Sequence, residues 1–290
     1  QTNKRRSRKN KRNSKQLYKR KDAWKWLIFL ELGGIDVPID ILHAKQQFKE
    51  YVKKYNPEDE KIKMKIAHIE RVSQYSKKIA ENLNLSEEDI KLAELIGLLH
   101  DIGRFEQVRL YHTFVDKDSI NHGEYGVKVL FEDELIRKFI EEDKFDKIIK
   151  LAILNHNRAK IESGLTEREN LHAKIIRDAD KTDIFYVLVT GDKKAIWEKA
   201  DLSDDKISDE IYREFIEDKE INYKERRTSA DILVSHFNYV YDLNFKETRQ
   251  IIKENQYIDK LYKRFTFNDA ETMRRFNEIY RLAKAKIEEE

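Results

Sequence analysis

Apolar residues recur at helical spacing along most of the chain. Between residues 60 and 84 they lie three, four or seven positions apart, at Ile62, Ile66, Ile69, Val72, Ile79 and Leu83, which predicts one amphipathic helix. Ser86 followed by Asp89 has the spacing of a helix N-cap and opens a second helix over 87–102 that Gly103 can end. The same reasoning predicts an irregular loop over 104–118 and further helices over 120–131, 134–142, 145–157, 167–190, 206–217, 227–243, 246–254 and 268–288.

No stretch alternates apolar and polar residues as a half-buried strand would. The chain has 290 residues with only 8 Gly and 2 Pro, too few for the tight turns of a sandwich or barrel. Hydrophobic residues make up 40% of the sequence, enough to bury a sizeable core. We therefore predict an all-α fold. The absence of cysteine excludes disulfides, thiolate-bound metals and cysteine nucleophiles.

Charge is distributed unevenly. Residues 1–25 hold 12 Lys or Arg and one acid, whereas the other 265 residues hold 46 basic and 54 acidic side chains. We expect three parts: a basic, disordered tail over 1–41, a metal-binding helical core over 42–195, and a C-terminal helical region over 196–290 packed on the core. The longest strongly apolar run, Trp26 to Leu30, is too short to cross a bilayer. We expect a cytoplasmic protein with no membrane partner.

The candidate chemistry starts at the end of the second predicted helix. The nearly apolar stretch from Leu92 to Leu99 is followed directly by His100 and Asp101. A helix that is apolar almost all round is buried, and a buried carboxylate is costly unless it is paired or bound to a cation. An imidazole and a carboxylate together suit a divalent metal. The alternative is an Asp hydrogen-bonded at a helix end.

Further residues of ligand type face apolar surroundings. His68 shares a helix face with Val72, and Asp180 lies four residues from both Ile176 and Ile184. His122 and His156 also lie beside apolar neighbours and could hold a second metal with Asp101 as a bridge, or could be ordinary core histidines. Because several helices supply these residues, a shared metal site is favoured over separate core roles.

The order His68, His100-Asp101, Asp180 resembles the HD-domain superfamily of metal-dependent phosphohydrolases. The strings HDIGRFEQ, DSINHGEYGVKVL, ILNHNR and IIRDADKTDIF are similar to a bacterial subfamily, and the likeness covers roughly residues 42–285. The resemblance implies that His68, His100, Asp101 and Asp180 bind a first metal. By similarity to two-metal members, His122 and His156 would bind a second. Asp180 is preferred to Asp178 because the family pattern A-D-[KR] matches Ala179-Asp180-Lys181.

The resemblance implies one or two divalent ions (Mn, Fe, Co, Ni, Zn or Mg) that activate a water for attack on a phosphate ester or anhydride. The sequence lacks the GYP motif of cyclic-dinucleotide phosphodiesterases. Arg104 also stands where HD 5′-nucleotidases carry a Glu. Neither of these two activities is therefore expected.

Cations near the expected ligands suit a phosphate substrate. Arg71 and Arg104 are candidates for catalysis and substrate binding, and Lys160 and Lys181 for substrate binding, although each could be a surface cation among 58. Asp183 either orients a ligand histidine or is a surface acid. We expect a small phosphorylated substrate, a nucleotide by preference. A nucleic-acid-binding protein or a nuclease that uses the basic tail is the alternative, and homo-oligomer formation is left open.

Overall fold

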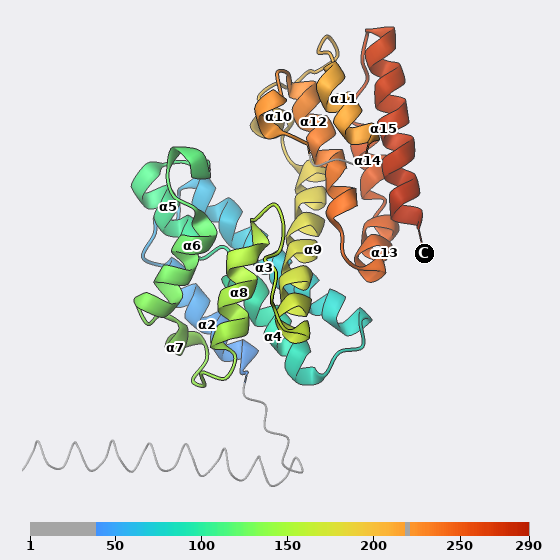
Figure 1. The fold of residues 1–290 in the computed structure, drawn as a ribbon. Coiled ribbons are helices and arrows are strands. Elements are labelled where there is room, and N and C mark those ends of the chain that lie inside the picture. Colours follow the sequence, from blue (N-terminus) through green and yellow to red (C-terminus); the bar gives the residue numbers. More distant parts are fainter. Residues whose placement is uncertain (1–38, 218–220, 290) are drawn as a thin grey trace, which may run out of the picture. The chain divides into compact units, whose positions relative to one another are not determined.

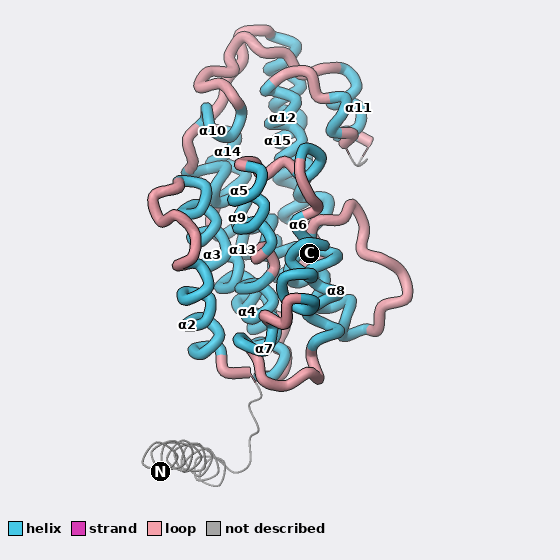
Figure 2. Tube along the Cα trace, turned by 90° about the vertical axis from the view of Figure 1, so that its left-hand side faces the viewer, coloured by secondary structure: helices cyan, strands magenta, loops and turns pink. Residues whose placement is uncertain are grey.

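The computed structural model describes residues 39–217 and 221–289. The predicted tail lies outside these residues except for positions 39–41. The described chain is all-α: Figure 2 shows helices joined by loops, and no strand occurs in the described ranges. Residues 39–290 make up one compact unit, so the division near residue 195 stays a prediction. None of the helices described is both long and apolar enough to cross a membrane.

Several helices in the first part of the chain begin at a side-chain cap. The side chain of Asp59 caps α3, Ser86 caps α4, and Thr166 forms a full capping box with Glu169 at the start of α9. The elements are α2 (Ile41–Val52), α3 (Glu60–Asn82), α4 (Glu87–Leu99), α5 (Gly103–Tyr111), η1 (Asp116–Asp118), α6 (His122–Val127), the π turn η2 (Lys128–Glu132), α7 (Ile136–Phe139), α8 (Asp146–His156) and α9 (Glu167–Thr190).

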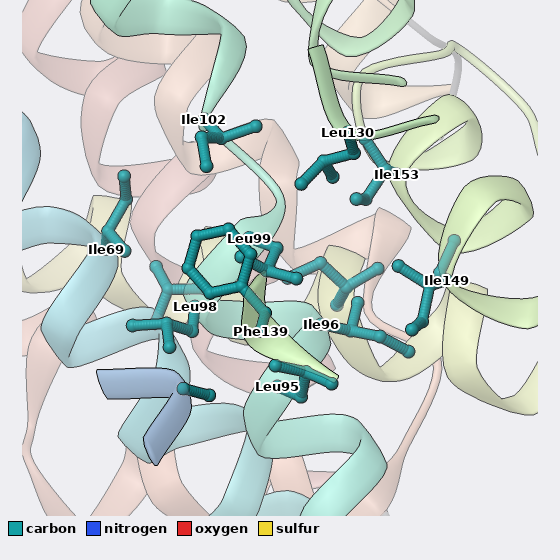
Figure 3. Close-up of a cluster of buried hydrophobic side chains, with 14 of the residues drawn as sticks. Ile69, Leu95, Ile96, Leu98, Leu99, Ile102, Leu130, Phe139, Ile149 and Ile153 are labelled. Atoms are coloured by element: carbon teal, nitrogen blue, oxygen red, sulfur yellow. The ribbon is translucent and has the colours of Figure 1, made fainter. Parts of the chain in front are cut away.

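Helix α4 forms the centre of the first hydrophobic cluster. From Leu92 to Leu99 every residue of this helix is buried, and α3, α8 and α9 all pack against it. Figure 3 shows leucines of α4 meeting side chains of α3, α7 and α8, among them Ile69, Phe139 and Ile153. Because α4 is covered on all sides, whatever follows it in the chain begins inside the core.

Helix α9 connects this cluster to the C-terminal helices (Figure 1). It contributes Ile175, Ile176 and Ala179 to the first cluster and, further along the helix, Phe185 and Leu188 to the next. The second cluster is built from α10 (Lys193–Trp197), α11 (Asp209–Ile216), α12 (Ser229–Phe237), η4 (Asn238–Asp242), α13 (Lys246–Glu254), α14 (Tyr257–Tyr262) and α15 (Ala270–Glu288). The short η3 (Tyr223–Glu225) lies between α11 and α12 in the chain.

The structure corrects the sequence prediction around residue 103. Helix α4 ends at Leu99, three residues earlier than predicted, and residues 103–111 form α5 where a loop was predicted. Phe105 and Val108 are buried one turn apart and hold α5 in place. Polar neighbours hid this short apolar pattern. The short helices α10 and α14 were not predicted either.

Helices α3 and α4 approach closely because residue 97 is a glycine. A Cβ at this position would lie 2.7 Å from the Cα of Ser73, 2.7 Å from Ser76 Oγ and 3.0 Å from the Val72 carbonyl oxygen. Backbone atoms of α3 cannot move aside as the end of a flexible side chain can. Gly97 therefore sets the distance between the helix that carries His68 and the helix that leads to His100.

We predict that Gly97→Ala lowers the free energy of unfolding by about 1–3 kcal/mol, because the added methyl group overpacks this helix crossing. Gly126→Ala is the matched control. Its Cβ would have no neighbour closer than 3.5 Å, and alanine has the higher helix propensity, so stability should be unchanged or slightly higher. Urea unfolding followed by circular dichroism measures both. Equal stability of the two variants would contradict the prediction.

Candidate metal centre

Segments far apart in the chain bring all six predicted ligand residues to one place. His68 lies in α3, His100 and Asp101 directly follow α4, His122 begins α6, His156 ends α8 and Asp180 lies in α9. Five of them are buried, and the side chain of Asp180 is 22% exposed. Because α4 is enclosed by the core, the pair that follows it meets the other helices inside the protein.

The first set of ligand atoms surrounds one oxygen of Asp101. His68 Nε2 lies 3.2 Å from Asp180 Oδ1 and 3.5 Å from Asp101 Oδ2. His100 Nε2 lies 3.7 Å from the same oxygen of Asp101 and 3.9 Å from Asp180 Oδ1. Two imidazoles and two carboxylates thus face a common point.

The second set surrounds the other oxygen of Asp101. Asp101 Oδ1 lies 3.5 Å from His122 Nε2 and 3.7 Å from His156 Nε2. The two Nε2 atoms are 3.0 Å apart. Asp101 therefore joins the two sets, one through each carboxylate oxygen, as expected from its position directly after His100.

A second close contact between backbones places His122. A Cβ at position 103 would lie 2.4 Å from the His122 carbonyl oxygen and 2.6 Å from Gly126 N. Gly103 thus lets the start of α5 rest against α6, and the histidine at the start of α6 comes within reach of Asp101.

The four histidines of these sets are oriented in the same way. Each ring contacts an acceptor through Nδ1 and turns Nε2 toward the carboxylates; the acceptors are Asp183 Oδ2 at 2.6 Å, the Gly97 carbonyl oxygen at 2.8 Å, Asp116 Oδ2 at 2.6 Å and the Ile153 carbonyl oxygen at 2.6 Å, for His68, His100, His122 and His156 respectively. A carbonyl oxygen only accepts, so Nδ1 carries the proton in His100 and His156. Their Nε2 atoms are bare lone pairs in the neutral ring, the form that binds metals.

The donor set fits divalent cations. Nitrogen and oxygen atoms bound to one ion at about 2.1 Å lie about 3.0–3.5 Å apart, close to the separations found here. Within the described residues, His100 Nε2 and Asp101 Oδ1 are buried without a hydrogen-bond partner, which is costly unless a cation takes their lone pairs. Two groups of three residues, His68–His100–Asp180 and His100–Asp101–His156, could each hold a metal ion, because the ligand atoms within each group lie within 4.8 Å of one another.

The buried carboxylates of the site need positive charge beside them. Burial alone would raise the pKa of Asp101, but Lys65 and the neighbouring imidazoles hold it well below its usual range. Burial and the Lys65 charge oppose protonation of His68, yet Asp101, Asp180 and Asp183 outweigh them and raise the pKa of His68 to about 10. Burial lowers the pKa of His100 to about 3. In the metal-free site a proton on His68 therefore balances the carboxylates.

Two cations lie directly against Asp101. Lys65 Nζ is 2.7 Å from Asp101 Oδ2, and Arg104 Nε is 3.5 Å from Asp101 Oδ1. Arg104 also donates through Nη1 to the Phe114 carbonyl oxygen at 2.6 Å and to Asp116 Oδ1 at 2.9 Å. Its guanidinium thus ties the segment after α5 to the centre as well as facing Asp101.

Arg71 and Asp183 form an ion pair behind His68. Arg71 Nε lies 2.5 Å from Asp183 Oδ1, Arg71 Nη2 lies 3.0 Å from Asp183 Oδ2, and the guanidinium stacks on the Tyr186 ring at 4.7 Å. Of the two roles considered for Asp183, the structure shows the orienting one, because this carboxylate is fully buried against His68 Nδ1. Arg71 is one helical turn from His68 and 28% exposed.

The two predicted substrate-binding lysines lie differently. Lys181 is buried and pairs with Asp242 Oδ2 at 2.7 Å, and Lys160 is exposed in the segment after α8. Asp178, the rejected alternative to Asp180, is buried away from the histidines. It accepts hydrogen bonds from the backbone of Asn244 and from Thr248 Oγ1.

Sequence reasoning missed two residues of the site, Lys65 and Asp116. Lys65 precedes His68 by three positions on the same face of α3, a spacing that could have identified it, but the chain's many other cations obscure this signal. Asp116 lies in a segment predicted to be irregular, and nothing in its local pattern indicates that it orients His122.

The HD-domain family model matches residues 66–184, a range that contains all six predicted ligand residues. No match was found among curated proteins or among solved structures.

We predict that metal binding at the first set releases about one proton per ion at pH 7, since the ion replaces the proton on His68. His68 is protonated below its pKa of about 10, so apparent affinity should rise about tenfold per pH unit between pH 7 and 9. Calorimetric titration in buffers of different ionisation enthalpy counts the protons. Binding of the first ion with no proton released would contradict the prediction; His122→Ala should retain the release.

Proposed function

We propose that this chain, whose residues 66–184 form an HD domain, hydrolyses a phosphate ester or anhydride of a small phosphorylated compound, with a nucleotide as the favoured substrate. HD domains are in general metal-dependent phosphohydrolases. The observation that carries the proposal is the convergence of His68, His100, Asp101 and Asp180. Among the described residues, His100 Nε2 and Asp101 Oδ1 are also buried without a hydrogen-bond partner. A divalent ion held there would supply a water nucleophile near neutral pH and draw charge from a phosphoryl oxygen.

The protein's own residues fix where the reaction takes place. Asp101 shares one oxygen with each ligand set, so the two sets keep a fixed separation. Asp180 and His68 have the most exposed side chains of the six, at 22% and 10%. We therefore place the approach of the phosphate on this side, where α3 and α9 meet.

Negative charge on the transferred phosphate is balanced by cations on α3 and α5. Arg71 lies one turn after His68, is partly exposed and is held rigidly by Asp183. Arg104 Nη1 donates hydrogen bonds to the segment after α5. The geometry thus favours Arg71 over Arg104 for direct contact with substrate, and gives Arg104 the role of holding the loop and facing Asp101.

A small substrate suits the charge of the protein body. Outside the first 25 residues acids exceed bases by eight, which disfavours a long polyanion. Nucleic acid stays an alternative through the basic N-terminal segment, which lies outside the described residues. Binding through that segment would weaken steeply with salt.

The test is hydrolysis across nucleotides, other phosphomonoesters and a single-stranded oligonucleotide with Mn²⁺, Co²⁺, Ni²⁺, Zn²⁺ or Mg²⁺. We expect phosphate release from a small phosphorylated compound. Activity only on the oligonucleotide, lost on deletion of residues 1–21, would favour the nuclease alternative. No turnover with any ion and no metal bound would overturn the proposal.

Asp101→Ala should abolish metal binding and reduce turnover by more than about a hundredfold, since losing even an outer-shell partner costs 10–100-fold. Asp118→Ala removes an exposed carboxylate of the nearby η1 and should leave both unchanged. Elemental analysis, circular dichroism and phosphate release measure metal, helicity and activity. Full metal content in Asp101→Ala would refute the ligand assignment.

A further inference from the structure

We infer that Asp242, which lies outside the HD match, positions His156 through Arg177 and so controls the second ligand set. The inference rests on the proposed metal centre. Asp242 ends η4 in the C-terminal helices, and Arg177 lies in α9 one turn before Asp180. The contacts below connect the two.

Arg177 clasps the end of α8. Its guanidinium is buried, with the side chain 3% exposed. It donates to three backbone carbonyl oxygens at the end of α8 and just beyond it: those of Asn155 at 3.0 Å, of Arg158, and of Ala159 at 3.2 Å. The Asn155 carbonyl lies in the last turn of α8, where partial negative charge gathers and a cation is favourable. The other two carbonyls belong to the segment that follows the helix.

Asp242 supplies the full charge that this buried cation needs. Arg177 Nη2 lies 2.6 Å from Asp242 Oδ2. Among the described residues, Asp242 is the carboxylate that forms an ion pair with Arg177. Helix-end carbonyls carry only about half a charge, and a buried cation that loses its partner is strongly destabilised. Without Asp242 we expect Arg177 to turn toward water and release the carbonyls.

His156 lies between the carbonyls that Arg177 holds. Asn155 precedes it, Arg158 follows two residues later, and the imidazole is oriented by the Ile153 carbonyl oxygen of the same helical turn. When this turn loosens, His156 Nε2 leaves its place beside Asp101 Oδ1. His68, His100 and Asp180 do not depend on this turn, so the first set should persist.

Asp242 is itself anchored to α9. Two residues later, Asn244 donates through its backbone and its side chain to buried Asp178 at 2.8–3.1 Å. Lys181 adds a second contact to Asp242 at 2.7 Å. The C-terminal helices are thus fixed to α9 at residues that alternate with those facing the metal centre.

The test compares Asp242→Asn with wild type by titrating Co²⁺ into the metal-free full chain, following visible absorption and metal-to-protein ratio. We expect two ions in wild type. In Asp242→Asn the second ion should bind about tenfold or more weakly, the usual loss of an outer-shell partner, with the first unchanged. Asp242→Glu should restore the second ion. Arg177→Lys, which keeps charge but loses the fork, should behave like Asp242→Asn.

Asp259→Asn is the matched control, because Asp259 is a C-terminal carboxylate paired with Lys284 rather than with α9. It should leave both ions in place. Asp242 is 46% exposed, so its variants should fold, as circular dichroism can verify. Tight binding of both ions by Asp242→Asn would overturn the inference alone. A single ion in wild type, unaffected by His122→Ala, would also overturn it but spare the proposed function. No bound ion at all would overturn both.

Discussion

The fold is organised around one buried carboxylate. Asp101 follows Leu98 and Leu99 out of the core helix and precedes buried Ile102, so its charge lies in apolar surroundings. Placing an ionised carboxylate there costs several kcal/mol unless positive charge surrounds it. Lys65 of α3 supplies one such charge, and imidazoles from α3, α6 and α8 face the two oxygens. The helices that carry these groups can pack together only if this charge is balanced. The stability of the core therefore depends on the charges of the site.

Helix α9 shows how position alone decides what an aspartate does. Asp178 and Asp180 are two residues apart and therefore face opposite sides of the helix. Asp178 meets neutral donors such as Asn244 and Thr248, so burial prevails and raises its pKa. Burial would also raise the pKa of Asp180, but His68 and His100 hold this pKa below its usual range. Asp178 joins the C-terminal helices to α9, and Asp180 faces the predicted metal site. Helix α9 therefore connects that site to the C-terminal helices.

The sequence predicted the long helices, the all-α class and the residues that converge, because each depends on local periodicity or on ligand types facing a core. Helix α5 escaped prediction because only Phe105 and Val108 anchor it among polar residues. Asp116 escaped because its role comes from a contact with His122, and Lys65 because its partner lies 36 positions away. The role of Asp116 arises only when separate segments meet. The spacing of Lys65 from His68 is a signal within one helix, but the chain's many other cations obscure it.

The partners of the imidazoles give the two ligand sets a shared design. In each set one ring is held by a carboxylate and the other by the backbone of its own helix. Asp183 holds His68 and Asp116 holds His122, whereas the remaining rings lean on carbonyl oxygens. An imidazole whose Nδ1–H is bonded to a carboxylate binds metal more strongly through Nε2 than one bonded to a carbonyl oxygen. Each set therefore combines one imidazole whose Nδ1 partner is a carboxylate with one imidazole whose orientation is fixed by the backbone of its own helix. Asp101 lies between the two sets, with one carboxylate oxygen toward each.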